Sequence, residues 1–344
     1  MRITKSVQKL EAYTPGEQPK ARNVVKLNTN ENPYPPSPKC AAALRRFDVS
    51  RLRKYPDPEF ADLRAALAKL NRTTPERVFV GNGSDEILAL AAKAFVEDNE
   101  SIGSLDPSYS LYRTLAAIRD VKWVGGCPKQ VAKDPAVALF LWTNPNAPTG
   151  EFVESKDIAA FARKFPGVVL VDEAYADFAR ANCMALATAR ANRNIIVMRT
   201  FSKSYSLAGL RVGYCVGPAD LIAALYKVKD SYNVDAVAQS VALAAVRDQE
   251  WMRRNVARVV KTRRRFTAEL ERRGWDVLPS ESNFVFARPP HRNAAALFDA
   301  LRARNIFVRY FRGPKTGDRL RVTIGTDSQM KKLLKALDEL NLKS

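Results

Sequence analysis

Short apolar runs alternate with helical patterns through the middle of this 344-residue chain, and this alternation constrains the fold more than any other feature. A parallel sheet that is covered by helices on both faces has this pattern, because its strands are buried on both sides. The apolar runs lie at residues 78–80, 138–142, 168–171, 195–198 and 212–216, and helices are expected at 84–96 and 155–164. The sequence therefore predicts an α/β domain.

The pattern changes near residue 249. A long amphipathic helix is followed by three segments with strand character, at 283–286, 306–308 and 320–324, between short helices. This order is typical of a smaller α+β unit. The first segment of the chain is rich in proline and is expected to be an extended arm. We therefore expect an arm over residues 1–31, a large domain over 32–250 and a small C-terminal domain over 251–344.

The residue types exclude several classes of catalytic site. The chain has one histidine, His291, so that a metal site rich in histidine or a hydrolase with a histidine relay is not expected. Its four cysteines form no C-x-x-C pair, which argues against a zinc cluster or a dithiol redox motif. We expect no metal, and proton chemistry that depends on lysine, tyrosine, aspartate or glutamate.

The chain is strongly basic, with 56 Lys and Arg against 36 Asp and Glu and a formal net charge of +20. Such an excess can attract nucleic acid. The densest basic segment, residues 253–273, alternates with apolar residues at helical spacing, which predicts a helix with a solvated basic face. No nucleic-acid partner is therefore expected. No apolar stretch approaches the ~20 residues of a membrane span, and the N-terminus lacks an apolar signal core. We expect a cytoplasmic protein.

Ligands of a parallel sheet bind beyond the carboxyl ends of its strands, and polar residues follow several of the apolar runs. After 78–80, the small residues around Ser84 and Asp85 open a helix, whose N–H groups can hold a phosphate. Either residue can equally be an N-cap. Asp172 follows 168–171, and Tyr175 comes three residues later. A buried carboxylate needs a cation or a hydrogen-bond donor. Asp172 can therefore serve a ligand, or it can be one end of a salt bridge within the protein.

A third strand end carries a candidate nucleophile. Lys203 lies between Ser202 and Ser204, and Arg211 follows eight residues later. The lysine amine can form an imine, whereas the serine and the arginine can bind a phosphate. Together with Asp172, which would hold a ring nitrogen protonated, these residues point to pyridoxal 5′-phosphate (PLP) as the cofactor.

The same residues resemble those of the fold-type I PLP-dependent aminotransferases. The resemblance is carried by Asp172-x-x-Tyr175, Ser202-Lys203 with Arg211, the Asn-Pro-Asn-Ala-Pro-Thr-Gly segment at 144–150 and Asp-Pro-Ser-Tyr at 106–109. Further motifs are similar to those of the histidinol-phosphate aminotransferase group, at residues 13–16, 27–33, 54–57, 83–86 and 320–326. The resemblance implies a large domain with a mostly parallel seven-stranded sheet, a smaller α+β domain and an N-terminal arm.

The resemblance also implies a role for each matching residue. Lys203 would form the internal aldimine and then act as general base, Asp172 would contact the ring nitrogen, and Tyr175 would contact the ring hydroxyl. The other expected cofactor contacts are Tyr109 on the ring face, with Ser84, Asp85, Ser202, Arg211 and the partner subunit's Tyr55 at the phosphate. Arg321, Tyr13 and Asn30 would bind the substrate. Homodimers with shared active sites are expected.

One position departs from the family pattern. Ala147 stands where the family has an asparagine that donates to the ring hydroxyl, and Asn144 or Asn146 could compensate through a shifted loop. The expected reaction is transfer of the amino group of histidinol phosphate to 2-oxoglutarate, with ping-pong kinetics. Three alternatives stay open: an aromatic amino-acid aminotransferase, a threonine-phosphate decarboxylase, and a basic nucleic-acid-binding protein that keeps the fold.

Overall fold

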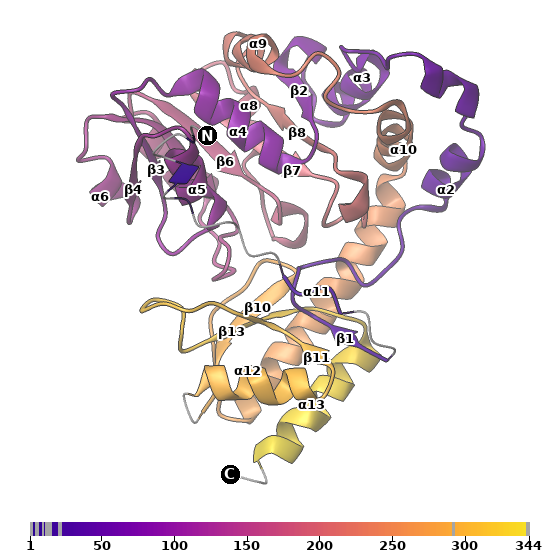
Figure 1. Ribbon diagram of the computed structural model, residues 1–344, viewed down its shortest axis with the longest axis vertical. Helices are drawn as coiled ribbons and strands as arrows, with labels where there is room; N and C mark the ends of the chain where they lie inside the picture. The colour runs from indigo at the N-terminus through magenta and orange to yellow at the C-terminus, as the bar shows by residue number, and fades with distance from the viewer. Residues whose placement is uncertain are drawn as a thin grey trace.

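A seven-stranded sheet forms the centre of the larger part of the molecule, within the described residues 3, 7–8, 10, 16–19, 23–290 and 293–341 of the computed structural model (Figure 1). Its strands lie in the order β2 (Val78–Gly81), β8 (Gly213–Val216), β7 (Ile195–Thr200), β6 (Val168–Asp172), β5 (Val137–Thr143), β3 (Ser101–Ser104) and β4 (Lys122–Gly125). The α/β fold with a mostly parallel sheet that the sequence predicts is confirmed.

Strand β8 departs from the parallel pattern, because it runs antiparallel to both β2 and β7. The connection from β7 to β8 contains the 3₁₀ turn η4 (Ala208–Leu210) and no α-helix, so the chain returns directly instead of crossing over the sheet. The apolar-run pattern cannot distinguish the two directions. It also did not indicate β3 and β4, whose Ser, Gly and Lys residues weaken the apolar signal.

Helices cover both faces of this sheet. Successive strand residues point to opposite sides, so both faces carry apolar side chains that a layer of helices buries. In β5, Leu139 and Leu141 join one hydrophobic cluster, whereas Phe140 and Trp142 join the other. The first cluster includes residues of α4 (Ser84–Phe95), α5 (Leu111–Ile118) and α9 (Ala219–Val228). The second includes residues of α2 (Pro38–Arg45), α3 (Ala61–Leu70), α7 (Ser155–Ala162), α8 (Met184–Thr188) and α10 (Ala236–Val246).

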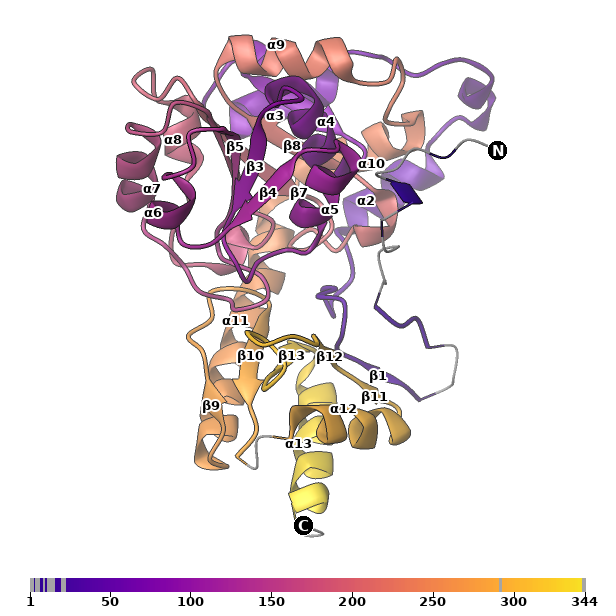
Figure 2. The same cartoon turned by 60° about the vertical axis from the view of Figure 1, so that its left-hand side comes forward.

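The C-terminal part has its own antiparallel sheet and its own hydrophobic cluster. The sheet order, as far as the chain is described, is β12 (Arg309–Tyr310), β13 (Leu320–Thr323), β10 (Phe284–Arg288) and β9 (Asp276–Val277). It packs with α11 (Gln249–Arg272), α12 (Ala294–Ala303) and α13 (Asp327–Asn341). The N-terminal segment joins this part, because β1 (Val25–Lys26) pairs in parallel with β11 (Ile306–Phe307) (Figure 2).

Helix α11 links the two parts. Its Met252 belongs to the cluster under the large sheet, and its Val259 belongs to the C-terminal cluster. The expected boundary at residue 250 therefore falls within this helix, and the three-part division into an arm and two domains stays a prediction.

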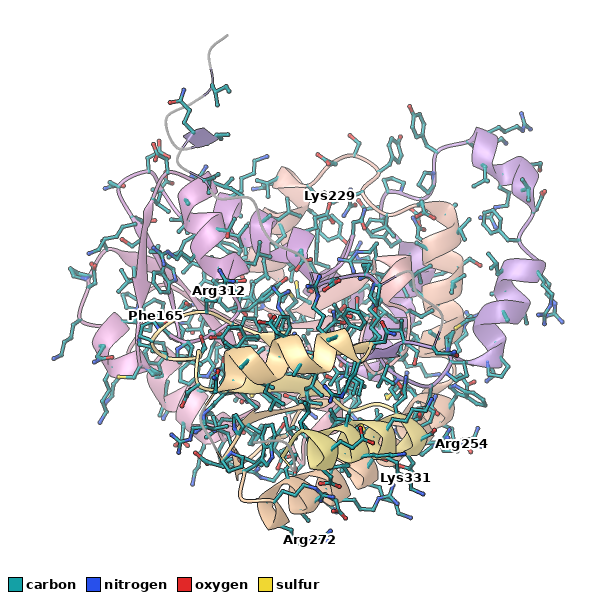
Figure 3. The ribbon with its side chains drawn as sticks, turned by 60° about the horizontal axis from the view of Figure 1, so that its bottom comes forward. Phe165, Lys229, Arg254, Arg272, Arg312 and Lys331 are labelled. Atoms are coloured by element: carbon teal, nitrogen blue, oxygen red, sulfur yellow. The ribbon has the colours of Figure 1, made fainter. Side chains whose placement is uncertain are left out.

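The basic residues of α11 mostly face outward, as the helical spacing predicts. Figure 3 shows Arg254 and Arg272 at the outer side of the molecule. Arg263 is an exception to the solvated face expected for 253–273, because its side chain is buried and donates to the carbonyl oxygens of Phe178 and Ser282. Burial lowers the pKa of Arg263 to about 10.

The remaining short elements are α6 (Pro128–Val131) and the 3₁₀ turns η1 (Val49–Arg53), η2 (Pro75–Arg77) and η3 (Ala176–Phe178). In the part of the chain that the structure describes, we find no helix with the length and apolar character needed to cross a membrane.

Candidate active site

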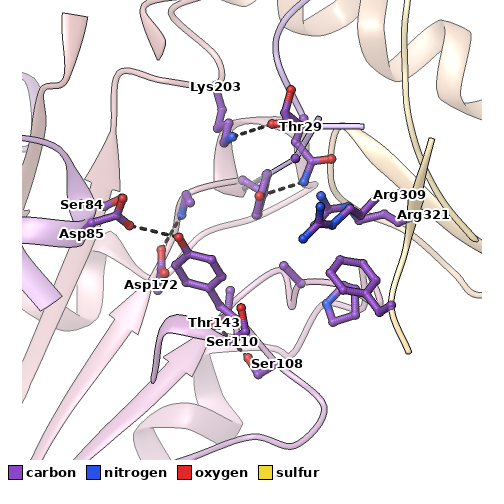
Figure 4. Close-up of a pocket in the computed structure, with 18 of the residues that line it drawn as sticks. Thr29, Ser84, Asp85, Ser108, Ser110, Thr143, Asp172, Lys203, Arg309 and Arg321 are labelled. Carbon is purple, nitrogen blue, oxygen red and sulfur yellow. Dashed lines mark hydrogen bonds between the residues drawn. The ribbon is translucent and has the colours of Figure 1, made fainter. Parts of the chain in front are cut away.

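A cavity of about 720 Å³ lies where the carboxyl ends of β5, β6 and β7 face the small sheet. Figure 4 places Ser84, Asp85 and Asp172 on one side of it and Arg309 and Arg321 on the other. Most of the site residues predicted from the sequence line it, and these are Asn30, Ser84, Asp85, Tyr109, Asp172, Tyr175, Ser202, Lys203, Arg211 and Arg321.

Asp172 is the last residue of β6, and its side chain is buried. Its Oδ2 accepts from the Tyr112 hydroxyl at 2.8 Å, and its Oδ1 accepts from the Ala174 amide at 3.0 Å. Burial raises the pKa of this carboxyl to about 6, although both donors oppose the increase. The cavity thus contains a carboxyl group that can hold or release a proton near neutral pH.

Lys203 enters the cavity from the loop after β7. Its Nζ donates to the carbonyl oxygen of Thr29 at 3.2 Å (Figure 4). Thr29 lies near the small sheet. The loop is fixed at the lysine and directly after it, because Asn32 Nδ2 donates to the Lys203 carbonyl oxygen at 3.3 Å and the Ser204 hydroxyl donates to Asp177. The amine is therefore held at the junction of the two halves of the cavity.

The inner end of the cavity is suited to a phosphate. Helix α4 begins at Ser84, after Gly83 with φ of +81°, and the guanidinium of Arg211 lies beside this turn. A Cβ at position 83 would lie 2.6 Å from Arg211 Nη2, so that glycine leaves the room for the guanidinium. Arg211 also donates to the Ser202 hydroxyl at 3.4 Å. Helix N–H groups, a hydroxyl and a guanidinium form a donor set that binds phosphate.

Asp85 and Tyr109 contact each other at this end. The Tyr109 hydroxyl donates to Asp85 Oδ1 at 3.2 Å, and Arg211 Nη2 lies 3.4 Å from Asp85 Oδ2. The Tyr109 ring is oriented edge to face with Tyr112, at 5.7 Å between centroids. The phenol of Tyr109 is thus held by a carboxylate that also faces the arginine.

The outer end of the cavity is formed by the small sheet and the N-terminal segment. Arg321 of β13 donates to the Asn28 carbonyl oxygen at 3.0 Å, and its guanidinium packs on the rings of Phe284 and Phe311. Asn30 Nδ2 donates to the Tyr175 hydroxyl at 2.9 Å. At the edge of the cavity, Lys315 pairs with Asp106 at 2.6 Å and joins the two halves.

One predicted residue, Tyr55, is not among the described residues that line this cavity. The Tyr55 side chain is 80% exposed and stacks on Tyr232, with 4.3 Å between ring centroids. Tyr13 lies outside the described residues. Neither the expected contact of Tyr55 with a partner's cofactor nor the substrate contact of Tyr13 is tested by a single chain.

Ala147 lines the cavity, whereas Asn144 and Asn146 are not among the described residues that line it. The Asn144 side chain bonds both the N–H and the carbonyl oxygen of Val153. Asn146 Nδ2 donates to the Pro107 carbonyl oxygen and to the Thr149 hydroxyl. Both amides are thus engaged with protein groups, and the expected compensation through a shifted loop stays a prediction.

Comparison with known proteins agrees with this donor set. The family model for class I and II aminotransferases matches residues 22–337. The chain belongs to this aminotransferase family. It is 44% identical to the histidinol-phosphate aminotransferase of Syntrophotalea carbinolica over 98% of this chain and 99% of the relative. It is also 44% identical to the Acetobacter pasteurianus enzyme of the same name, over 97% and 96% of the two chains.

A solved structure gives the same family. The histidinol-phosphate aminotransferase of Sinorhizobium meliloti, in complex with pyridoxal 5′-phosphate, superposes with a TM-score of 0.90 at 26% identity, over 98% of this chain and 97% of that one. The family resemblance stated from the sequence is confirmed. The roles of the individual site residues of this aminotransferase are untested by these comparisons.

Sequence reasoning missed part of the aminotransferase site. Tyr112 donates to Asp172 and shares a hydrogen bond with the hydroxyl of Thr143, which lines the cavity. The signal for Tyr112 was available, because it lies three residues after Tyr109, in the first turn of α5. Thr143 ends β5, next to the end of β6.

Proposed function

We propose that this aminotransferase transfers the amino group of histidinol phosphate to 2-oxoglutarate, with PLP as its cofactor. The observation that carries the proposal is the cavity itself. It brings the buried carboxyl of Asp172 and the amine of Lys203 together, between an arginine at its inner end and an arginine at its outer end. Two separate cationic ends suit a phosphorylated cofactor and an anionic substrate side by side.

The residues present fit PLP. The N-terminus of α4, Ser202 and Arg211 would hold its phosphate, Asp172 would face its ring nitrogen, and Lys203 would bind its aldehyde carbon. When bound, this cofactor supplies a carbonyl that takes up an amine and a ring that accepts electrons from a broken Cα–H bond. Tyr175 would contact the ring hydroxyl, with its own hydroxyl oriented by Asn30.

Lys203 would perform the proton transfer at the substrate. Its Nζ lies in the cavity, and no described residue that lines the cavity is a histidine. The contact with Thr29 holds the amine towards the small sheet, where the substrate would bind. In this proposal the amine would take the proton from the substrate carbon and would hold it for its return during the transfer.

Arg321 would determine the preference for a substrate with an acidic group. Its packing against Phe284 and Phe311 limits the rotation of the guanidinium, and Arg309 lies at the same end. Two guanidinium groups stabilise a phosphate dianion more strongly than they stabilise a carboxylate, which carries a single charge. This arrangement favours histidinol phosphate over phenylalanine or tyrosine.

We further propose a cytoplasmic homodimer, in which Tyr55 reaches the cofactor phosphate of the partner subunit. Tyr55 is 80% exposed, and the exposed apolar residues Leu44, Val49 and Leu52 belong to the same stretch of chain. An exposed apolar group of this kind is typical of a surface that a second subunit covers.

A panel of amino donors with 2-oxoglutarate tests the proposed substrate. Histidinol phosphate should give the highest kcat/KM, and product formation should follow ping-pong kinetics. A tenfold preference for phenylalanine, which corresponds to ~1.4 kcal/mol of transition-state binding, would identify an aromatic aminotransferase instead. Release of carbon dioxide from threonine phosphate without any need for 2-oxoglutarate would identify a decarboxylase.

A further inference from the structure

A chain of four hydrogen-bonding contacts runs from Asp172 into the protein. Asp172 Oδ2 lies 2.8 Å from the Tyr112 hydroxyl, which lies 2.5 Å from the Thr143 hydroxyl. Thr143 lies 3.1 Å from the Ser108 hydroxyl, and Ser108 donates to Asn146 Oδ1 at 2.8 Å. Three consecutive hydroxyl groups thus connect a carboxyl at one end with an amide at the other.

The amide end of this chain can only accept. Asn146 Nδ2 donates to the Pro107 carbonyl oxygen at 3.0 Å, and a carbonyl oxygen cannot donate in return. The amide orientation is therefore fixed, with Oδ1 towards Ser108. Since a hydroxyl has one hydrogen, Ser108 uses its own for Asn146 and must accept from Thr143.

Counting hydrogens gives the chain a preferred direction. For every contact to hold a hydrogen, Thr143 would accept from Tyr112, and Tyr112 would accept from a protonated Asp172, which reverses the donation that Tyr112 makes to the carboxylate. All four contacts are satisfied when Asp172 carries a proton. When Asp172 is ionised, three hydrogens serve four contacts, and one pair of oxygens faces each other without a hydrogen.

Resting on the proposed function, we propose that Ser108 and Thr143 form a directional hydrogen-bond chain that draws the hydrogen of Tyr112 away from Asp172 and so keeps a proton on Asp172 until the ring nitrogen of the cofactor takes it. Tyr112 and Thr143 are then positioning residues for the reaction, since they act through Asp172. The cofactor-free enzyme would carry the proton in the place where the bound ring needs it.

The proton balance is closed within the site. Asp172 gives its proton to the ring nitrogen, which becomes cationic, and the carboxyl becomes a carboxylate. Tyr112 turns its hydrogen from Thr143 to Asp172, and Thr143 turns its hydrogen from Ser108 to Tyr112. No proton leaves the protein, and the contact that loses its hydrogen is the one between Thr143 and Ser108, the longest of the four.

Other charged groups also act on Asp172. Asp85 of α4 and the adjacent Glu173 both disfavour its ionised form. Glu173 is paired with Arg199 of β7 at 2.8 Å, and Lys203 and Tyr175 line the same cavity. These groups are unchanged in the variants below, so that their contribution cancels in the comparison.

The hydrogen count predicts opposite effects for two kinds of variant. In Thr143→Val or Ser108→Ala, Tyr112 can donate to an ionised Asp172 without leaving another contact short of a hydrogen. The carboxyl should therefore titrate about one pH unit lower, which is a tenfold change in the proton equilibrium. Tyr112→Phe removes the donor to the carboxylate, so the carboxyl should titrate about one unit higher.

The test is a pH titration of the full-length protein without PLP, followed by the infrared C=O stretch of protonated carboxyl groups. The band of Asp172 is identified by its absence in Asp172→Asn. The matched control is Tyr226→Phe, because this buried hydroxyl makes no hydrogen bond to any described residue and its loss should leave the Asp172 titration unchanged. Thermal melting of each variant confirms that it is folded.

Opposite shifts in Tyr112→Phe and Thr143→Val support the directional chain. Shifts of the same sign in Tyr112→Phe and Thr143→Val would overturn it. An unchanged Asp172 titration in Thr143→Val or in Ser108→Ala would also overturn it. If Thr143→Val does not fold, Ser108→Ala takes its place in the comparison. If Tyr112→Phe does not fold, an unchanged titration in Thr143→Val and Ser108→Ala still overturns the chain.

A second readout uses the enzyme loaded with PLP that carries ¹⁵N at the ring nitrogen. The ¹⁵N chemical shift should report a protonated ring in the wild type and a partly deprotonated ring at high pH in Tyr112→Phe. A chain that does not bind PLP would refute the proposed function, whereas the infrared titration would still measure the hydrogen-bond chain.

Discussion

The two ends of the cavity are built in different ways. The inner end takes its groups from strand ends and the N-terminus of α4, and Asp172 is fixed there by two hydrogen bonds. The outer end takes its groups from the small sheet and the N-terminal segment, where Arg321 is held by ring packing and one carbonyl oxygen. We infer that the inner end serves the chemistry and the outer end serves substrate choice, so changes at the two ends should affect different kinetic constants.

Lys203→Ala should give the largest effect. Removal of the amine takes away both the cofactor attachment and the general base, so transamination should fall by at least about 10⁴-fold. The protein should stay folded, because the side chain makes one hydrogen bond to a carbonyl oxygen. Steady-state rates and the absorbance of bound PLP measure this change. Substantial turnover in the purified variant would show that another group carries the chemistry.

Asp172→Asn should lower kcat by about 10²- to 10³-fold with a smaller effect on KM, since it removes a charge that acts on the reacting ring. Single-turnover kinetics separates this loss from substrate binding. Equal losses in kcat and in substrate affinity would remove the distinction between the two ends.

The same carboxyl predicts a pH effect on stability in the cofactor-free protein. Burial raises the pKa of Asp172 from 3.8 to about 6, so the folded state binds the proton more tightly than the unfolded state. Stability should therefore fall as pH rises from ~4 to ~6, by about 3 kcal/mol for this group. Urea unfolding at the two pH values, compared with Asp172→Asn, isolates the contribution. An equal pH dependence in the variant would assign the effect to other groups.

Arg321→Gln should act at the outer end. Loss of a charge-assisted contact of about 1.5–3 kcal/mol should lower kcat/KM for histidinol phosphate by about 10- to 100-fold, mainly through KM. Arg321→Lys keeps the charge and should recover part of the loss. If kcat at saturating substrate fell as much as kcat/KM, the arginine would act in the transition state and not in ground-state binding.

The smallest effect is expected for Lys315→Gln. The ion pair of Lys315 with Asp106 is partly exposed, and such pairs contribute about 0–1 kcal/mol. KM should rise by at most about fivefold at low ionic strength, and the difference from the wild type should disappear in high salt. A large effect that persisted in high salt would mean that the pair controls closure of the cavity.

The inner end could be predicted from the sequence because its residues directly follow buried strands. Asp172 and Lys203 were found in this way, and the structure places both in one cavity. Tyr112 and Thr143 were not found, because their contacts with Asp172 depend on how α5 and β5 approach β6 in space. Arg263 was assigned to a solvated face, since helical spacing does not show that the loop after β6 covers that part of α11.

The outer end was predicted through the family resemblance and not from the residues themselves. Arg321 lies in the middle of a short strand, and no local pattern distinguishes it from the many other arginines of this basic chain. Its position at the cavity depends on the antiparallel pairing of β13 with β10 and β12.

The pairing of β1 with β11 has a consequence for synthesis on the ribosome. Residues 25–26 find their partner strand about 280 residues later in the chain, so they stay unpaired for roughly 14–56 s at 5–20 residues per second. The large sheet can form before that time, because its last strand ends at Val216. The outer end of the cavity therefore completes last, and a nascent chain cannot bind its amino donor until nearly all of it has been translated.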